Sequence, residues 1–213
     1  MNIGIFGGTF NPIHNAHLRI AEESRDQYAL SQVFFVPAAS PPHKPHHRQL
    51  SFTHRLNMAA LAIADNPFFA LSDIEGQRSG KSYSIDTLHA FRASYPDDRL
   101  FFIMGSDSFA EIGTWYDYEN LFALTSIIVV GRPGVEGFSL ASALPVAISH
   151  RFCYDSKVNH LTHCSGTTVS YLSGVPLPIS SSSIRELLRR GQSVRYLVPD
   201  PVEHYLKEHT LYA

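Results

Sequence analysis

The sequence predicts a single α/β domain built on a doubly wound parallel sheet. Short apolar runs alternate with amphipathic segments along most of the chain, and this alternation is typical of parallel strands with helices on both faces of the sheet. The strand-like runs are almost continuously apolar, as expected when both faces are buried. The length of 213 residues suits one domain better than two, so residues 1–213 are interpreted as one unit.

The predicted elements follow in order. Strands are predicted at Asn2–Phe6, Gln32–Pro37, Phe69–Ser72, Leu100–Met104, Ser126–Val130 and, from a weaker pattern, Val169–Leu172. Helices are predicted at Ala16–Tyr28, Ser51–Ala64, Ser84–Ser94, Tyr116–Leu124, Ser181–Arg190 and Pro201–His209. Ser180 or Ser181 would cap the helix near position 185, and Gly191 would end it. Residues 135–168 give no usable pattern, and their histidines (His150, His160 and His163) are interpreted as surface or structural residues.

Composition and charge narrow the class of protein. Hydrophobic residues make up 44% of the chain, charged residues 17%, and the net charge is -2 with His neutral. This is an ordinary globular composition without the basic surplus that nucleic-acid binding favours. No apolar run is long enough to span a bilayer, and the first residues do not resemble a signal peptide. We expect a cytoplasmic protein with no nucleic-acid or membrane partner, and homo-oligomerisation stays open.

The two cysteines, Cys153 and Cys164, are distant in sequence and lack metal-ligand spacing. We interpret them as reduced thiols, since disulfides are rare in cytosolic proteins.

A glycine turn joins the first predicted strand to the first predicted helix. Gly7 and Gly8 follow the strand directly, and the helix begins near Ala16. Glycines allow the backbone to approach a phosphate closely, and the free N–H groups and dipole of a helix start favour negative charge. The spacing fits neither the G-x-G-x-x-G pattern nor the P-loop, which argues against a hydride-transferring dinucleotide enzyme.

His14 and His17 lie three residues apart at this helix start, so they share one face of the helix. Imidazole N–H groups can bind phosphate oxygens and offset charge as a phosphoryl bond breaks. Two other interpretations stay open on the residues alone. One is a zinc pair, for which no third ligand occurs at local spacing. The other is a pair of structural histidines that satisfy the helix start.

The same segment resembles the first motif of the H-x-G-H nucleotidyltransferase superfamily, roughly G-G-x-F-D-P-x-H-x-G-H. The matching residues are Gly7, Gly8, Thr9, Phe10, Asn11, Pro12, His14, Ala16 and His17. Asn11 stands in place of Asp, and Ala16 stands in place of Gly. The resemblance implies a Rossmann-like nucleotidyltransferase fold and favours the phosphate-binding interpretation of the two histidines.

A second signature of that superfamily, I-S-S-T-x-I-R, is similar to a segment near the other end of the chain. The matching residues are Ile179, Ser180, Ser181, Ser182, Ser183, Ile184 and Arg185, with Ser182 in place of Thr. A serine-rich helix start offers hydroxyl and N–H groups to an anion, and a guanidinium can bind phosphate oxygens. We expect the two helix starts to converge on one triphosphate. The alternative is an ordinary serine N-cap with a solvated arginine.

The middle of the chain resembles the bacterial nicotinate-nucleotide adenylyltransferases. Ser40–Lys44 is similar to their N-P-P-H-K motif, with Ser40 in place of Asn, and residues 81–88 are similar to S-Y-T-x-D-T-L, with Ser84 in place of Thr. Lys44 is a point charge suited to a phosphate, or else a solvated loop lysine. Free N–H groups of Tyr83 and Ser84 would suit a carboxylate, and the resemblance implies that it belongs to nicotinate.

The family pattern G-x-D followed by W-Y is similar to Gly105, Asp107, Trp115 and Tyr116. Trp115 could stack on a pyridine ring or be a core aromatic residue. Asp107 could bind ribose hydroxyls or cap a helix. The resemblance also places Arg132, after the fifth predicted strand, near the acceptor pocket.

Together the motifs predict adenylyl transfer from ATP to nicotinic acid mononucleotide, which gives nicotinic acid adenine dinucleotide and pyrophosphate in NAD biosynthesis. Two alternatives remain. The acceptor could be another phosphate such as nicotinamide mononucleotide or phosphopantetheine, or the chain could be a non-catalytic nucleotide-binding module. Mg²⁺ is expected to arrive with the substrate phosphates, and no protein metal site is predicted.

The predicted site residues fall into three groups. The catalytic group is His14, His17, Lys44 and Arg185. The ATP-binding group is Gly7, Gly8, Thr9, Phe10, His14, His17, Gly105, Asp107, Ile179, Ser180, Ser181, Ser182 and Arg185, with the helical segment 175–213 completing the ATP site. The acceptor-binding group is Lys44, Tyr83, Ser84, Trp115, Tyr116 and Arg132.

Overall fold

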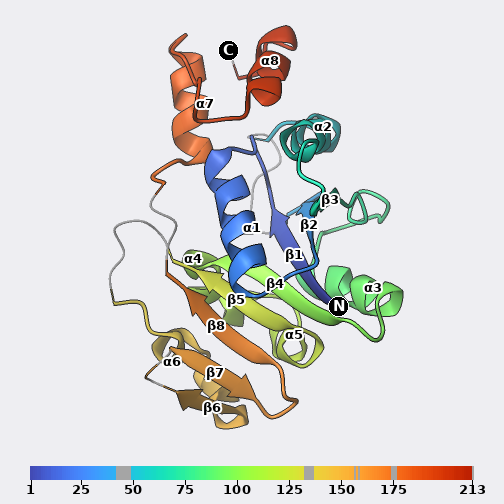
Figure 1. Ribbon diagram of the computed structural model, residues 1–213, viewed down its shortest axis with the longest axis vertical. Helices are drawn as coiled ribbons and strands as arrows, with labels where there is room; N and C mark the ends of the chain where they lie inside the picture. The colour runs from blue at the N-terminus through green and yellow to red at the C-terminus, as the bar shows by residue number, and fades with distance from the viewer. Residues whose placement is uncertain (42–48, 132–136, 156, 158, 174–176, 213) are drawn as a thin grey trace.

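The computed structural model describes residues 1–41, 49–131, 137–155, 157, 159–173 and 177–212 (Figure 1). The strands are β1 (Asn2–Gly8), β2 (Gln32–Pro37), β3 (Phe69–Leu71), β4 (Arg99–Gly105), β5 (Ser126–Val130), β6 (Phe152–Asp155), β7 (His160–His163) and β8 (Thr168–Leu172). They form one sheet in the order β3-β2-β1-β4-β5-β8-β7-β6. The strands from β3 to β8 in this order pair in parallel, as the sequence predicts.

Helices cover both faces of the sheet (Figure 1). They are α1 (Asn15–Gln27), α2 (Phe52–Ile63), α3 (Ser84–Ser94), α4 (Ser106–Ala110), α5 (Tyr118–Leu124), α6 (Leu140–Ala143), α7 (Ser181–Arg189) and α8 (Asp200–Glu208), with 3-10 turns η2 (Ile112–Thr114) and η3 (Val146–Arg151). None of these helices is long and apolar enough to cross a membrane.

The central strand β1 contributes to two cores, one on each face of the sheet. Ile3 and Ile5 join a cluster that includes the apolar residues of α3 and α5. Phe6 joins a second cluster with residues of α1, α2, α7 and α8. Because successive side chains of a strand point to opposite faces, the apolar run of β1 supplies both cores. This explains why its sequence shows no polar alternation.

Two antiparallel strands that the sequence analysis did not predict extend the sheet, so the sheet is mixed rather than purely parallel. β6 pairs with β7, and β7 pairs with β8. Three of the four residues of β6 are exposed, so it lacks the apolar run of a strand covered on both faces. His150 is exposed, while His163 is buried against the rings of Phe122 and Phe152.

The helix predicted at Tyr116–Leu124 begins two residues later, at Tyr118. Its N-cap, Asp117, has a φ of 53°, a left-handed backbone conformation that Asp tolerates better than most residues and that cannot continue a helix.

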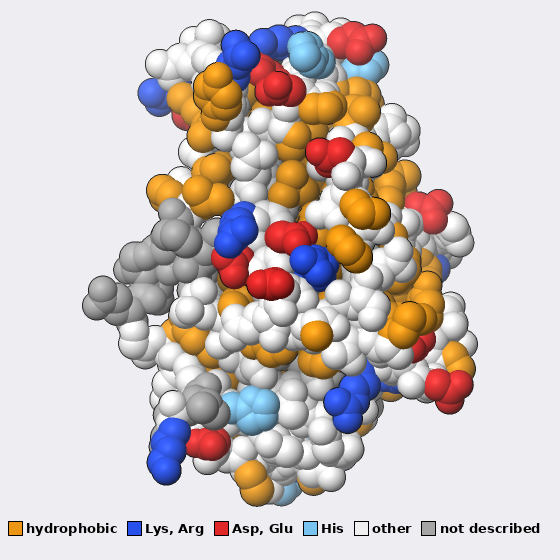
Figure 2. All heavy atoms as spheres, viewed as in Figure 1, with side chains coloured by type: hydrophobic (Ala, Val, Ile, Leu, Met, Phe, Trp, Pro, Cys, Tyr) orange, Lys and Arg blue, Asp and Glu red, His pale blue; other side chains and the backbone are white. Residues whose placement is uncertain are grey.

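The surface over α1 carries intermixed acidic and basic side chains (Figure 2). Arg25 pairs with Glu22, and Arg19 pairs with Glu23. Both pairs have the three- or four-residue spacing that brings side chains together on a helix. This face of the molecule therefore presents both signs of charge over α1 rather than a field of one sign.

Strand order reverses beside β1, and this reversal locates a binding crevice. The chain runs outward from β1 through β2 to β3, then returns to place β4 on the other side of β1. In open α/β sheets ligands bind at such a switch point, outside the carboxyl ends of the strands. Gly8 and Gly105 end the two strands concerned.

Candidate active site

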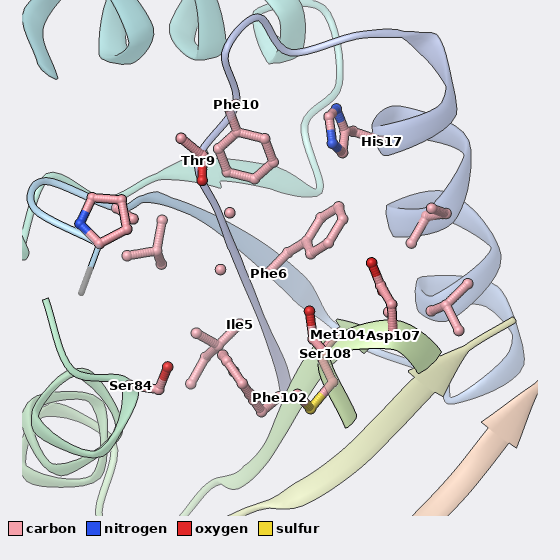
Figure 3. Close-up of a pocket in the computed structure, with 18 of the residues that line it drawn as sticks. Ile5, Phe6, Thr9, Phe10, His17, Ser84, Phe102, Met104, Asp107 and Ser108 are labelled. Carbon is pink, nitrogen blue, oxygen red and sulfur yellow. The ribbon is translucent and has the colours of Figure 1, made fainter. Parts of the chain in front are cut away.

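A cavity of about 540 Å³ lies at the carboxyl ends of β1 and β4. Figure 3 shows Thr9 and Phe10 of the loop after β1 beside His17 of α1, with Asp107 of α4 and Ser84 of α3 farther along the wall. The predicted site residues that line it are Gly7, Gly8, Thr9, Phe10, His14, His17, Tyr83, Ser84, Gly105, Asp107, Trp115, Tyr116, Ile179 and Ser180. The structure thus brings most of the residues predicted for ATP and acceptor binding into one cavity.

Three predicted residues, Ser181, Ser182 and Arg185, are not among those that line the cavity. They follow Ser180, which does line it, in the first turns of α7. Lys44 and Arg132 lie outside the described residues, so their predicted roles stay predictions.

The loop after β1 is compact because Phe10 folds back over Gly8. A Cβ atom at Gly8 would lie 2.8 Å from the Phe10 ring, so only glycine fits there without displacing that ring. Phe10 itself has a φ of 46°, which is uncommon for a residue with a side chain. Its ring packs edge-on against Phe6 at 5.6 Å and against His17 at 5.1 Å between ring centroids.

His14 and His17 form the start of α1 together. The backbone N–H of His14 donates to Nδ1 of His17 at 3.2 Å, and the two rings stack with centroids 3.6 Å apart. An accepting Nδ1 carries no proton, so the neutral ring of His17 must carry its proton on Nε2. His17 therefore presents Nε2–H as the donor that a phosphate oxygen needs.

The start of α7 docks against the loop after β1, although the contacting residues are 169 and 174 positions apart in sequence. The Ser181 hydroxyl donates to the Pro12 carbonyl at 2.9 Å, and Nη1 of Arg185 donates to the Asn11 carbonyl at 2.8 Å. In Figure 1 α7 stands directly beyond the first turn of α1. The two helix starts therefore lie together, and their binding of one triphosphate stays a prediction.

Serine capping defines the start of α7. The Ser180 hydroxyl accepts from the backbone N–H of Ser183 at 3.1 Å, and the Ser183 side chain accepts in return from the Ser180 N–H. The reciprocal pattern is a capping box. It places Ser180 as the N-cap, one of the two residues that the sequence predicts for this role, and Gly191 follows the helix with a φ of 66°.

Aromatic residues form the side of the cavity where the acceptor is predicted. Trp115 is partly buried and packs edge-on against Phe102, with 6.3 Å between ring centroids. The Tyr83 ring lies 4.6 Å from that of Tyr116, which is 62% exposed. Trp115 is therefore both a core contact and part of the cavity wall, and its stacking on a pyridine ring stays a prediction.

Glu75 lines the cavity but was not predicted. It is 8% exposed, and its Oε1 accepts from the Thr87 hydroxyl at 2.8 Å, while Arg78 donates to the same hydroxyl at 2.6 Å. Among the described residues its Oε2 is buried without a hydrogen-bond partner. The only signal in the sequence is its position in the loop after the third predicted strand, on the rim where ligands bind.

No group of three or more His, Cys, Asp or Glu side chains in the described part of the chain could hold a metal ion.

Several known proteins are similar to this chain over its full length. A family model described as cytidylyltransferase-like matches residues 5–187. A probable nicotinate-nucleotide adenylyltransferase of Citrifermentans bemidjiense is 61% identical over 212 residues, which cover 100% of this chain and 98% of the relative. The corresponding protein of Geobacter sulfurreducens is 57% identical over 213 residues, which cover 100% and 99%.

Among solved structures, the Plasmodium falciparum nicotinic acid mononucleotide adenylyltransferase complexed with NaAD matches with a TM-score of 0.75 and 20% identity. The match covers 99% of this chain and 97% of that one, and it shows the shared fold. The full-length identity to the curated relatives goes further. The chain belongs to the cytidylyltransferase-like nucleotidyltransferases and, within them, to the nicotinate-nucleotide adenylyltransferases.

Proposed function

We propose that this cavity transfers the adenylyl group of ATP to the phosphate of nicotinic acid mononucleotide. The observation that carries the proposal is the meeting of two anion-binding helix starts, at His14–His17 and at Ser180, in a cavity whose other wall holds Trp115 and the start of α3. One region suits a triphosphate and the other suits an aromatic acid. The high sequence identity to full-length probable nicotinate-nucleotide adenylyltransferases supports the same reaction.

The reaction needs no protein nucleophile. An oxygen of the acceptor phosphate attacks the α-phosphorus of ATP, a new P–O–P bond forms, and the bond to the β-phosphate breaks as pyrophosphate leaves. Catalysis then consists of positioning and of stabilising charge on the transferred group. His17 would donate from Nε2 to an oxygen of the α-phosphate, with its ring held by the His14 N–H and by Phe10.

Arg185 has two tasks in this proposal. Nη1 holds the Asn11 carbonyl and Nη2 contacts the Ser182 hydroxyl at 3.2 Å, so the side chain first fixes α7 to the loop after β1. A guanidinium has five N–H donors, and the others would serve the β- and γ-phosphates. Lys44 would serve the same phosphates, as the family motif implies.

Mg²⁺ enters as part of the substrate MgATP. Mg²⁺ is commonly held by substrate phosphates and water with few protein ligands, so we expect the metal to arrive and leave with the phosphates.

One observation favours nicotinamide mononucleotide as a second acceptor. Glu75 Oε2 is buried at the cavity without a partner among the described residues. The other oxygen of this carboxylate, Oε1, accepts from the hydroxyl of Thr87 in α3. A carboxamide could donate to Oε2 and accept from the Ser84 N–H, whereas a carboxylate would meet like charge at Glu75. Glu75→Gln would shift the ratio of kcat/KM for the two acceptors toward the acid.

A direct assay tests the proposal. The purified chain is incubated with MgATP and with nicotinic acid mononucleotide, nicotinamide mononucleotide or phosphopantetheine, and pyrophosphate and the dinucleotide product are quantified. We expect the highest kcat/KM with nicotinic acid mononucleotide. Faster turnover of another acceptor would replace the proposed substrate, and ATP binding without turnover of any acceptor would indicate a nucleotide-binding module.

A further inference from the structure

Arg55 in α2 is a buried cation that the proposed reaction does not use. Its side chain is 1% exposed, and its hydrogen bonds within the described part of the chain go to main-chain carbonyl oxygens. Burial lowers the pKa of the guanidinium, but arginine stays protonated at neutral pH. Burying a charge is costly unless it is well hydrogen-bonded, so the position calls for an explanation beyond packing.

The three carbonyl groups belong to three separate segments. Nη1 donates to Thr9 at 2.9 Å, Nη2 donates to Ala39 at 3.3 Å, and Nε donates to Leu50 at 3.2 Å. Thr9 lies in the loop after β1 and lines the cavity. Ala39 and Leu50 lie near the two ends of the segment that contains Lys44. One guanidinium therefore fixes the loop after β1 relative to the backbone at Ala39 and Leu50.

The bond to Thr9 acts on a strained part of the loop. Phe10, the next residue, has a φ of 46°, a conformation that costs free energy for a residue other than glycine and that persists only where the surroundings enforce it. The C=O and N–H of a trans peptide point in opposite directions. Holding the Thr9 carbonyl toward Arg55 therefore turns the N–H of Phe10 away from α2.

The bond to Ala39 reaches the acceptor side of the cavity. The next residue, Ser40, exchanges two hydrogen bonds with Ser82. The Ser40 N–H donates to the Ser82 hydroxyl, and the Ser82 N–H donates to the Ser40 carbonyl, both at 2.9 Å. Ser82 directly precedes Tyr83 and the start of α3. A continuous chain of contacts thus runs from Thr9 through Arg55 and Ser40 to the acceptor wall.

We propose that Arg55 is a positioning residue that holds the loop after β1, the backbone at Ala39 and Leu50 and the acceptor wall in register, and that its buried charge also favours the bound triphosphate. The inference rests on the proposed function in assigning phosphates to the loop after β1. Arg55 need not touch a substrate, because it acts through the carbonyls of Thr9 and Ala39.

Two substitutions separate geometry from charge. Arg55→Lys keeps the charge but replaces a planar fork by a compact ammonium, whose donors all lie on one nitrogen and cannot span three separate carbonyls. Arg55→Met removes the charge and all three bonds. Met58→Ala is the matched control, because Met58 is fully buried one turn along the same helix, packs in the core and does not line the cavity. Each variant is measured for its unfolding midpoint, its Kd for MgATP without acceptor, and its kcat and KM for both substrates.

For Arg55→Lys we expect a Kd for MgATP within about threefold of wild type and a kcat lowered about tenfold or more, since small misplacements of reacting groups cost this much. For Arg55→Met we expect a Kd raised about tenfold or more, because a charge that attracts the triphosphate is lost, and a kcat lowered on the order of 10²-fold. Met58→Ala should lose stability but keep Kd and kcat within about threefold, since it removes only core packing.

The proposal is overturned if both Arg55 variants match Met58→Ala in Kd and kcat at comparable unfolding midpoints. If Arg55→Met does not fold, Arg55→Lys decides alone, because an unchanged kcat would exclude the positioning role. The Kd measurement needs no acceptor. If wild type binds MgATP but does not turn over nicotinic acid mononucleotide, the proposed function fails, and the Kd of Arg55→Met still tests Arg55.

Discussion

The rings of His14 and His17 stack with their centroids 3.6 Å apart and their planes inclined by 23°. The stack is fixed from two sides, by the hydrogen bond from the His14 N–H to Nδ1 of His17 and by the edge of the Phe10 ring. Preorganised donors stabilise a transition state best when they need not reorganise during the reaction. The arrangement therefore holds the His17 ring in place, as its proposed role on the transferred phosphate requires.

Replacing His17 by alanine should lower kcat on the order of 10²-fold, the scale of losing one preorganised transition-state contact. Steady-state kinetics with saturating MgATP would measure it. His17→Gln is the control for the helix start, because its amide oxygen can still accept from the His14 N–H. We expect His17→Gln to keep the stability of wild type but not its kcat. A folded His17→Ala enzyme with near-normal kcat would remove His17 from the chemistry.

Replacing Trp115 by alanine should raise the KM of the acceptor more than the KM of ATP. The indole lines the cavity at its acceptor side, and its edge-on contact with Phe102 sets the orientation of its plane. Stacking of aromatic rings contributes about 0.5–1.5 kcal/mol beyond area burial, so a severalfold change is expected. Trp115→Phe retains a ring and should show a smaller effect. Equal rises in both KM values would mean that Trp115 only packs.

Much of the fold was predictable because it depends on local signals. The strands β1, β2, β4 and β5 have almost continuous apolar runs, and the sequence places them within one or two residues of their observed bounds. β6 and β7 were not predicted because they extend the sheet as antiparallel strands. The outer strand, β6, is mostly exposed, so its side chains show no apolar pattern. The left-handed backbone of Asp117 likewise has no signature in the sequence, so the sequence pattern placed Asp117 within the first turn of the helix.

The residues of the site likewise divide into those that the sequence predicted and those that only the structure identifies. Residues in motifs, such as His17, Ser84 and Ser180, could be assigned to a shared cavity because they sit at helix starts on one rim of the sheet. Arg55 and Glu75 could not, because their roles depend on contacts between segments that are distant in sequence. A charged residue in an amphipathic helix is usually exposed, and only the packed structure reveals that Arg55 is buried.

Removing the N-cap of α7 should affect both stability and ATP binding. Ser180→Ala removes the hydroxyl that accepts from the Ser183 N–H, and loss of a serine N-cap costs about 1 kcal/mol. Because Ser180 lines the cavity, we also expect a higher KM for ATP. Ser139→Ala is the matched control, since Ser139 caps α6 and does not line the cavity. Chemical denaturation and kinetics would show whether only Ser180→Ala changes the KM.

Equal KM values for ATP in Ser180→Ala and Ser139→Ala would mean that the start of α7 is only a structural cap. Such a result would leave His17 and Trp115 unaffected, because their predictions concern other parts of the cavity wall.

The stability of the protein should fall in mild acid because of His163. Its side chain is 6% exposed and packs against Phe152 with ring centroids 4.8 Å apart. Burial lowers the pKa of His163 below its ordinary value near 6.5, and the positive charge of Arg151 lowers it further. The unfolded chain therefore binds a proton at this residue at a higher pH than the folded chain does. Linkage then requires that stability falls as the pH drops below about 6.5, while above that value both states are neutral and the residue has no effect.

Urea denaturation between pH 5 and 8 would measure this contribution, with His163→Gln as the comparison. Nδ1 of His163 lies 2.7 Å from the Ser165 hydroxyl, and glutamine can keep a polar contact there without titrating. The free energy of unfolding should fall less steeply for His163→Gln than for wild type once the pH is below 6.5, and the slopes should agree near pH 8. Parallel curves over the whole range would show that another group causes the loss in acid, because His163→Gln removes the titrating imidazole at this position.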